Sequence, residues 1–368
     1  MKKILGFGLM LIAGGLLGYF GASYLKGDDV GSDGNPYALW VLALLPVLFI
    51  LVVGIHELGH VAAGLTQRFN FYGLTIGPFS WKPDAEGKIR FSWNTQLNVA
   101  GGVAMMLPEG TERLRQRFMW FAAGGPLASL LLALLAFGIS RLVAEDTFLA
   151  LLFVAIGAFS ATICVATLLP FRAGGFASDG LRILTFARNG KTAAADLASL
   201  RALAHMRAGQ PYEALPAADF AAAATDPATP EQQKITLNYY RYLHALGTGE
   251  FDAAAELLEG VMAKLDVYPD GAQYSFYAEQ ALFEAKYRRN LPAAEAAWAQ
   301  FQENPFSEAL SVHLAKAAQA ELREDYVTLA AELPGIEKGL TRTIDQSRVP
   351  LINEWLKEWR SMADNDIS

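Results

Sequence analysis

The sequence has one cysteine, few histidines and no excess of positive charge. A lone cysteine, Cys164, cannot build a disulfide framework or a thiolate metal cage within one chain, and we expect it to be a small core residue. The formal net charge of −7 provides no basic patch of the kind that nucleic acid needs. Disulfide-stapled folds and nucleic-acid binding are therefore excluded.

Long apolar runs are present instead, and nearly all of them lie in the first half of the chain. Four stretches approach or exceed the roughly 20 residues that span a bilayer core; they are about 4–24, 38–66, 118–140 and 147–171. The first is longer than a signal-peptide core and lacks a clean cleavage site, so we expect a retained helix, with a cleaved signal peptide as the alternative. Residues 1–186 are thus predicted to form a polytopic α-helical domain in the lipid bilayer.

Lysine and arginine collect on one side of this topology. They lie between the second and third stretches and after the fourth, at Arg68, Lys82, Lys88, Arg90, Arg113, Arg115, Arg117, Arg172, Arg182, Arg188 and Lys191. The other two connections are "KGDDVGSDGNP" and "RLVAED", with one basic residue each. Because cytoplasmic loops carry the excess of Lys and Arg, both termini are predicted to be cytoplasmic, and we expect a bacterial cytoplasmic (inner) membrane.

The second stretch ends with the pattern "HELGH", which contains His56, Glu57 and His60. On a helix, positions i and i+4 share a face, so the two imidazoles can reach one metal ion while the glutamate lies beside them. This spacing is typical of sites in which the glutamate acts as general base toward water. Ionisable groups at membrane depth cost a few kcal/mol each, which favours a function over the alternative of two histidines that only hydrogen-bond to neighbouring helices.

A catalytic zinc site normally takes three protein ligands, so a third must come from elsewhere in the chain. The second and fourth stretches run in the same direction, and the exit of the fourth therefore reaches the membrane face where the histidines lie. Asp179 is the first carboxylate after that exit. The alternative is an ordinary turn or N-cap aspartate in "SDG".

Three motifs in order now resemble a known family. "HELGH" in an apolar helix, "AAGGPLASLLLALL" opening a later helix, and "LLP" followed by "SDG" are similar to the site-2 protease family of intramembrane zinc metalloproteases, over roughly residues 40–185. The resemblance implies a zinc ion held by His56, His60 and Asp179, with Glu57 activating water. It also implies cleavage of transmembrane or membrane-proximal segments of other proteins, in regulated proteolysis or signal-peptide remnant processing.

The chain departs from the family pattern at three places. Thr167 and Ser129 stand where the family commonly has asparagine. The nine-residue step from Pro170 to Asp179 is longer than the family's. Its extra "RAGG" either lets the aspartate swing in or marks a divergent subfamily. These departures concern substrate positioning more than metal binding.

Residues 69–107 alternate apolar and polar side chains around "PDAEGK" and predict a β-hairpin. Because a substrate helix has its backbone groups paired internally, an exposed sheet edge is one way to hold a locally unwound substrate strand. The alternative is a cytoplasmic hairpin without a substrate role. Gly124 and Gly125, followed by Pro126, permit close helix contact or a break near the metal, or serve packing alone.

Residues 187–368 are rich in Ala and charged residues at helical spacing, and segments starting at 249, 289 and 323 begin alike. They predict a cytoplasmic tetratricopeptide-like array of helix pairs whose concave face binds a peptide or protein partner. A non-repeat helical bundle is the alternative. His205, His244 and His313 are expected to be ordinary core or surface residues. The amphipathic segment "PLINEWLKEWRSM" either caps this domain or rests on the membrane surface.

Together these patterns predict a mainly α protein: a membrane domain of about four spans with a β-hairpin insertion, followed by a soluble all-α domain. The predicted function is that of a zinc metalloendopeptidase acting on membrane-protein or peptide substrates. A non-catalytic membrane scaffold, whose helical domain binds a protein partner, is the competing class. A zinc transporter is less favoured because the four stretches offer no further carboxylates or histidines for an ion path.

Overall fold

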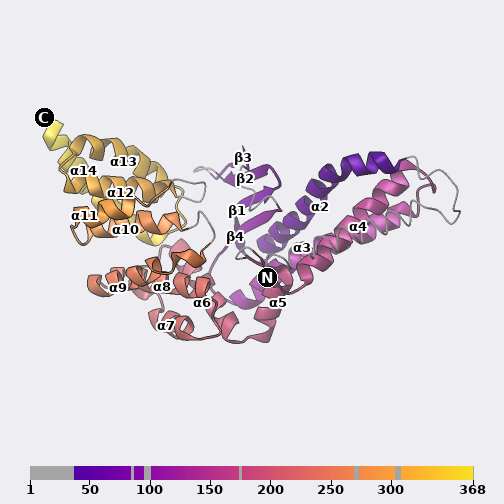
Figure 1. Ribbon diagram of the computed structural model, residues 1–368, viewed down its shortest axis with the longest axis horizontal. Coiled ribbons are helices and arrows are strands. Elements are labelled where there is room, and N and C mark those ends of the chain that lie inside the picture. Colours follow the sequence, from indigo (N-terminus) through magenta and orange to yellow (C-terminus); the bar gives the residue numbers. More distant parts are fainter. Residues whose placement is uncertain are drawn as a thin grey trace. The chain divides into compact units, whose positions relative to one another are not determined.

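The structure is a computed structural model that describes residues 37–83, 87–94, 101–173, 176–268, 273–302 and 308–367. The described residues are mainly helical, as predicted, with thirteen α-helices and a small four-stranded sheet (Figure 1). The chain folds into two compact units. The first, here called the membrane unit, ends at Arg188, and the second, the helical unit, contains the residues from Asn189 onward. The assignment of these parts to a metalloprotease domain and a cytoplasmic domain stays a prediction.

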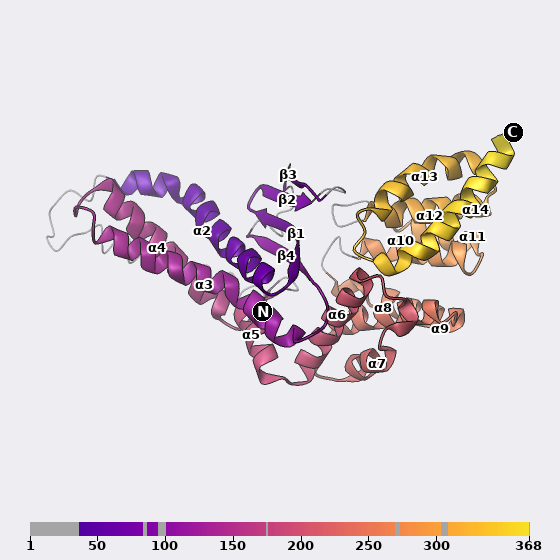
Figure 2. The same cartoon turned by 180° about the vertical axis from the view of Figure 1, so that it is seen from behind.

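Three long apolar helices form the body of the membrane unit, and Figure 2 shows them from behind. They are α2 (Ala38–Thr66), α3 (Leu114–Ser140) and α4 (Phe148–Leu168), and each is long and apolar enough to cross a membrane. A helix suits this environment because it pairs its backbone groups internally, which lipid cannot do for them. These helices correspond to the second, third and fourth predicted spans. The first predicted span, 4–24, lies outside the described residues.

The contact between α2 and α3 depends on glycine. A Cβ added at Gly59 would lie 2.4 Å from the carbonyl oxygen of Gly124, and one added at Gly124 would lie 2.4 Å from that of Gly59. Small residues let membrane helices approach this closely and gain dispersion contacts where no hydrophobic drive between helices exists. Of the two roles considered for Gly124, close contact is the one observed, because α3 continues unbroken through Pro126.

The insertion after α2 is a four-stranded sheet, which corrects the prediction of a single hairpin. Its strands are β1 (Phe69–Ile76), β2 (Phe79–Pro83), β3 (Ile89–Trp93) and β4 (Val103–Pro108), in the order β3-β2-β1-β4. β2 and β3 pair antiparallel across the expected turn. A second turn was missed: Gly77, with φ of 55°, reverses the chain so that Ile76 pairs with Phe79.

The sheet packs on α2 beside the predicted site. Leu74 and Ile76 of β1 are buried against Val53 of α2, one turn before "HELGH". The order of the strands places β4 next to β1 as an end strand of the sheet. A strand edge is therefore held close to the helix that carries the candidate metal ligands.

The helical unit follows a short helix, α5 (Asp179–Arg188), that still belongs to the membrane unit. Its α-helices are α6 (Lys191–Arg207), α7 (Ala217–Thr225), α8 (Glu231–Gly247), α9 (Phe251–Met262), α10 (Tyr274–Lys286), α11 (Leu291–Trp298), α12 (Ala309–Leu322), α13 (Tyr326–Leu340) and α14 (Val349–Ile367). Three 3-10 turns lie between them: η2 (Tyr212–Ala214), η3 (Leu265–Val267) and η4 (Gln346–Arg348).

Three of the tight turns between helices share one geometry. The pairs α8–α9, α10–α11 and α12–α13 each turn at a residue with left-handed backbone: Gly249, Arg289 and Glu324, with φ of 76°, 51° and 57°. In each, the next residue donates its N–H back to a carbonyl near the end of the first helix. The turns explain why the three segments begin alike in sequence. A tetratricopeptide-like repeat stays a prediction.

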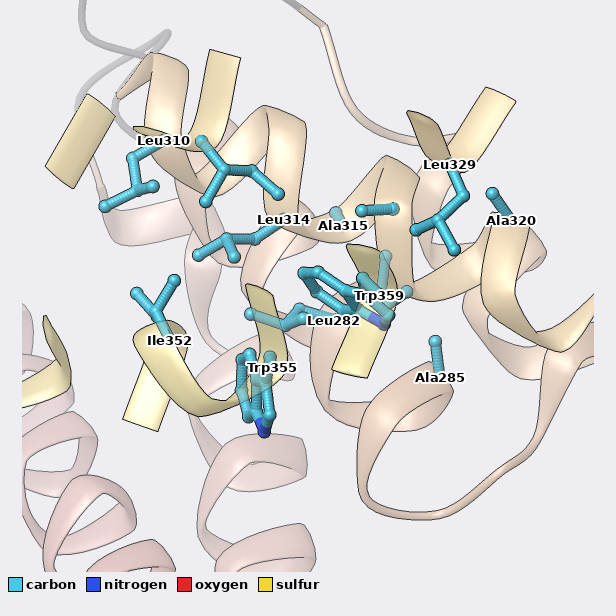
Figure 3. Close-up of a cluster of buried hydrophobic side chains, with 14 of the residues drawn as sticks. Leu282, Ala285, Leu310, Leu314, Ala315, Ala320, Leu329, Ile352, Trp355 and Trp359 are labelled. Atoms are coloured by element: carbon cyan, nitrogen blue, oxygen red, sulfur yellow. The ribbon is translucent and has the colours of Figure 1, made fainter. Parts of the chain in front are cut away.

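One core cluster of the helical unit combines alanines, leucines and isoleucines with two tryptophans (Figure 3). Ala315, Leu314 and Leu282 pack with Trp355 and Trp359 of α14, and Trp359 is fully buried. The apolar face of α14 is thus used inside the unit, as in the capping alternative. Burying a side chain of this size contributes several kcal/mol, and its removal would leave a large cavity.

Candidate metal centre

Three side chains from distant parts of the sequence converge at the end of α2. His56 and His60 lie on one face of the helix, and Asp179 is the first residue of α5. The Nε2 atoms of both histidines lie 3.3 Å from Oδ2 of Asp179. All three residues are at most 9% exposed. The structure therefore brings together the two helical ligands and the aspartate that were predicted as a set.

The spacing of these atoms fits a zinc ion. In a tetrahedral site with bonds of about 2.0–2.1 Å, neighbouring ligand atoms lie about 3.3–3.4 Å apart. The observed separation of 3.3 Å between each Nε2 and Oδ2 has this value. Two imidazoles and one carboxylate also form a donor set common in catalytic zinc sites. Among the described residues this is the one cluster of its kind, and the histidines of the helical unit take no part in it.

The other ring nitrogens of the two histidines are held by protein groups. Nδ1 of His60 lies 2.9 Å from the carbonyl oxygen of Phe121 and 3.3 Å from the backbone N of Gly125. In the tautomer in which Nδ1 donates to the Phe121 carbonyl, Nε2 keeps its lone pair. Nδ1 of His56 lies 2.9 Å from Oγ of Ser129. Such partners fix the ring orientation of metal-binding histidines. Ser129, noted in the sequence only as a departure from the family, thus contacts a candidate ligand directly.

A glycine of α3 leaves room for the cluster. A Cβ added at Gly125 would lie 2.3 Å from Nε2 of His60 and 2.6 Å from Nε2 of His56. These distances are far below any real contact, so a side chain here would displace the imidazoles. Gly125 therefore leaves space for the imidazoles, whereas its neighbour Gly124 allows the close contact between α2 and α3.

Glu57 lies beside the cluster without joining it. Its side chain is buried, and the backbone N–H of Ala104 in β4 donates a hydrogen bond to its carboxylate. Gly102, with φ of 106°, approaches so closely that an added Cβ would lie 2.8 Å from Oε1 of Glu57. The strand that follows this glycine thus holds the carboxylate next to the three candidate ligands. The sequence had shown "AGGVAMML" without revealing this contact.

The long step between Pro170 and Asp179 folds into a small hairpin. β5 (Arg172–Ala173) and β6 (Phe176–Ala177) pair antiparallel within this step. After the hairpin the chain returns to the end of α4, where a Cβ on Gly180 would lie 1.8 Å from the carbonyl oxygen of Leu168. With this longer step in place, Oδ2 of Asp179 lies 3.3 Å from Nε2 of both histidines.

The charge state of Asp179 suits a ligand. Burial acts to raise the pKa of its carboxyl, but hydrogen bonds from His56 and His60 and the positive charge of these histidines in their protonated form outweigh burial and hold the pKa below its usual range. The carboxylate is therefore ionised at neutral pH, as metal binding requires.

Comparison with known proteins agrees with this site. The model of Peptidase family M50, the site-2 protease family of zinc metalloproteases, matches residues 44–344, and the chain therefore belongs to that family. The match continues well past the residues 40–185 that carried the resemblance. No curated protein and no solved structure matches the chain. Family membership and the three apolar helices together indicate an integral membrane metalloprotease.

Proposed function

We propose that the protein is an intramembrane zinc metalloendopeptidase that hydrolyses peptide bonds in or near transmembrane segments of other membrane proteins. One observation carries the proposal: His56, His60 and Asp179 place three ligand atoms within 4.8 Å of one another in a buried position. His56, His60 and Asp179 are the proposed zinc ligands, and Glu57 is the proposed catalytic residue.

The residues around the site suit hydrolysis. A bound zinc ion supplies Lewis-acid chemistry, which polarises a carbonyl and lowers the pKa of water. Glu57 takes a proton from the attacking water at its carboxylate and delivers it to the leaving amide nitrogen. The N–H of Ala104 fixes this carboxylate. Ser129 and the Phe121 carbonyl hold the imidazoles, so the groups are in place before substrate arrives.

The sheet offers a way to present the substrate. β4 is an end strand, and its residue Ala104 already contacts Glu57. A substrate segment that unwinds and adds to this strand would replace its lost helical hydrogen bonds with sheet bonds. Its scissile bond would then lie near the carboxylate. We infer that β4 holds the substrate in extended form.

The membrane setting and the helical unit complete the proposal. The distribution of Lys and Arg supports cytoplasmic termini, and a bacterial inner membrane is the proposed location. The helical unit would then lie in the cytoplasm, where it can bind a protein partner. The competing function, a scaffold without activity, needs the same partner binding but no dependence on Glu57.

Metal content and cleavage, measured together, test the proposal. Detergent-purified wild type, His56→Ala, Asp179→Ala and Glu57→Gln are compared, with His313→Ala in the helical unit as the matched histidine control. We expect zinc in wild type, Glu57→Gln and His313→Ala, loss of zinc in the other two, and cleavage of a transmembrane test substrate only by wild type and His313→Ala. Zinc without any cleavage by wild type would favour the scaffold, and full zinc in Asp179→Ala would place the third ligand elsewhere.

A further inference from the structure

The hydroxyl of Ser178, the residue before Asp179, makes three hydrogen bonds. Its Oγ accepts from the backbone N–H of Phe171 at 3.1 Å and from that of Leu181 at 3.2 Å. It donates to the carbonyl oxygen of Leu169 at 2.6 Å. One side chain thus uses all of its hydrogen-bonding capacity on the backbone of two separate segments.

These segments are the two ends of the β5–β6 hairpin. Leu169 and Phe171 lie where the chain leaves α4, and Leu181 lies in the first turn of α5. A further backbone bond, from Ser178 N to Phe171 O at 3.0 Å, closes the same loop. The start of α5 is therefore tied to the end of α4 immediately beside the carboxylate.

These hydrogen bonds restrict the position of Asp179, which would otherwise be attached to α4 only through the longer connection that begins at Pro170. Its carboxylate must stay 3.3 Å from two imidazoles that belong to a different helix. Metal affinity depends on whether ligands are held in advance, and loss of a group that hydrogen-bonds directly to a ligand typically costs about 10- to 100-fold. Ser178 acts one step further out, on the backbone that carries the ligand. Gly180 adds a close fit against Leu168.

We propose that Ser178 is a positioning residue that closes the β5–β6 loop and thereby holds Asp179 in place as a zinc ligand. This rests on the proposed function, because it takes zinc as the ion at His56, His60 and Asp179. An ordinary N-cap serine would stabilise only its own helix, through the bond to Leu181. The bond to Leu169, nine residues away, goes beyond that role.

The chain contains a matched control for an ordinary cap. Thr147 caps α4: its Oγ1 accepts from Ala150 N at 3.2 Å and donates to Ala144 O at 2.8 Å. Both partners lie only three residues away, and α4 runs on from there to Leu168 before the Asp179 loop begins. Thr147→Ala therefore removes a helix cap of the same chemistry at the other end of α4.

The test is the zinc affinity of detergent-purified protein, measured by competition with a chromophoric chelator, alongside thermal unfolding. We expect Ser178→Ala to weaken zinc binding by about tenfold or more, and Ser178→Thr, which keeps the hydroxyl, to bind within about twofold of wild type. Thr147→Ala should bind zinc as wild type does, even where its unfolding temperature falls.

Each other outcome has a distinct meaning. Unchanged zinc affinity in Ser178→Ala, or an equal loss in Thr147→Ala, would overturn the positioning role and leave the proposed function intact. Failure of Ser178→Thr to restore binding would likewise overturn the assignment to the hydroxyl. Absence of zinc binding by wild type would overturn the proposed function itself, and the positioning role with it.

Discussion

The two units of the chain bury polar side chains for different purposes. In the membrane unit, the buried His56, His60 and Asp179 point to one place and leave ligand atoms directed at one another. In the helical unit, the buried Glu279 and Arg348 satisfy each other through two hydrogen bonds of 2.5 and 2.9 Å. The first arrangement can still bind a metal ion, whereas in the second the two charges are already paired with each other. A buried charge alone therefore does not indicate a functional site. A site is indicated where buried side chains keep ligand atoms that can still bind a further group.

The difference predicts that a change in the membrane unit affects chemistry without affecting the fold. Glu57→Gln removes the carboxylate that is proposed to accept the proton but keeps its size and its contact with Ala104. We expect cleavage to fall by about 10²–10⁴-fold, the usual contribution of a general base. Zinc content and unfolding temperature should remain those of wild type. A variant that still cleaves at half the wild-type rate would show that the base is another group.

The converse holds in the helical unit, where Glu279→Ala leaves the Arg348 guanidinium buried without its partner. We expect a loss of about 3–5 kcal/mol of the unit's stability, measured by chemical unfolding. Zinc content should not change. A loss below about 1 kcal/mol would mean that water or another acid replaces the partner.

The same pair gives a pH dependence. Burial acts to raise the pKa of Glu279, but Arg348 outweighs it and lowers the pKa below its usual value. The pair therefore contributes stability at pH values above the ordinary glutamate pKa, and this contribution is lost as the pH falls through the lowered pKa. Wild type should thus lose more stability than Glu279→Gln on acidification from pH 7 to pH 4.

Alanine substitution of two glycines in α3 tests the geometry of the candidate metal centre. In Gly125→Ala the new methyl group would occupy the space beside both Nε2 atoms, so we expect zinc affinity to fall by about 100-fold. Gly138→Ala, also in α3, meets nothing within 4 Å and serves as the control. Equal zinc affinity in the two variants would contradict the described position of α3 against the histidines.

The smallest expected effects are at the helix turns. Glu324 adopts a left-handed backbone that favours glycine, so Glu324→Gly should raise the stability of the helical unit by about 0.5 kcal/mol. Gly249→Ala, at the equivalent turn, should lower it by about 1 kcal/mol. Changes of opposite sign in chemical unfolding would support a shared turn geometry, and changes of the same sign would argue against it.

Part of the candidate metal centre was predictable because two of its residues lie one helical turn apart. His56 and His60 follow from helical spacing. The direction of the apolar helices made Asp179 one of two interpretations, and the resemblance to the family favoured it as a ligand. The supports were not predictable, because Ser129, Gly125 and the Phe121 carbonyl reach the histidines only through the packing of α3 on α2. Ser178 is the exception. A serine before "DG" signals a helix N-cap, and that signal was present in the sequence.

The sequence predicted the apolar helices of the fold better than the sheet and the turns between helices. The apolar helices follow from composition, but their ends shift by a few residues, since α3 begins at Leu114 and α4 ends at Leu168. The sheet was underestimated because a two-residue reversal at Gly77 and Pro78 leaves little trace in an alternating pattern. Arg289 and Glu324 adopt a left-handed backbone at their turns, but arginine and glutamate do not predict this conformation. Such features depend on tertiary packing, which overrides local preference.

The most direct test of the central claim is the zinc K-edge absorption spectrum of the purified wild-type protein. We expect a first shell of nitrogen and oxygen at about 2.0–2.1 Å in wild type, with scattering from two imidazoles, and loss of the zinc signal in Asp179→Ala. A sulfur ligand at about 2.3 Å, or a spectrum unchanged by Asp179→Ala, would contradict the central claim.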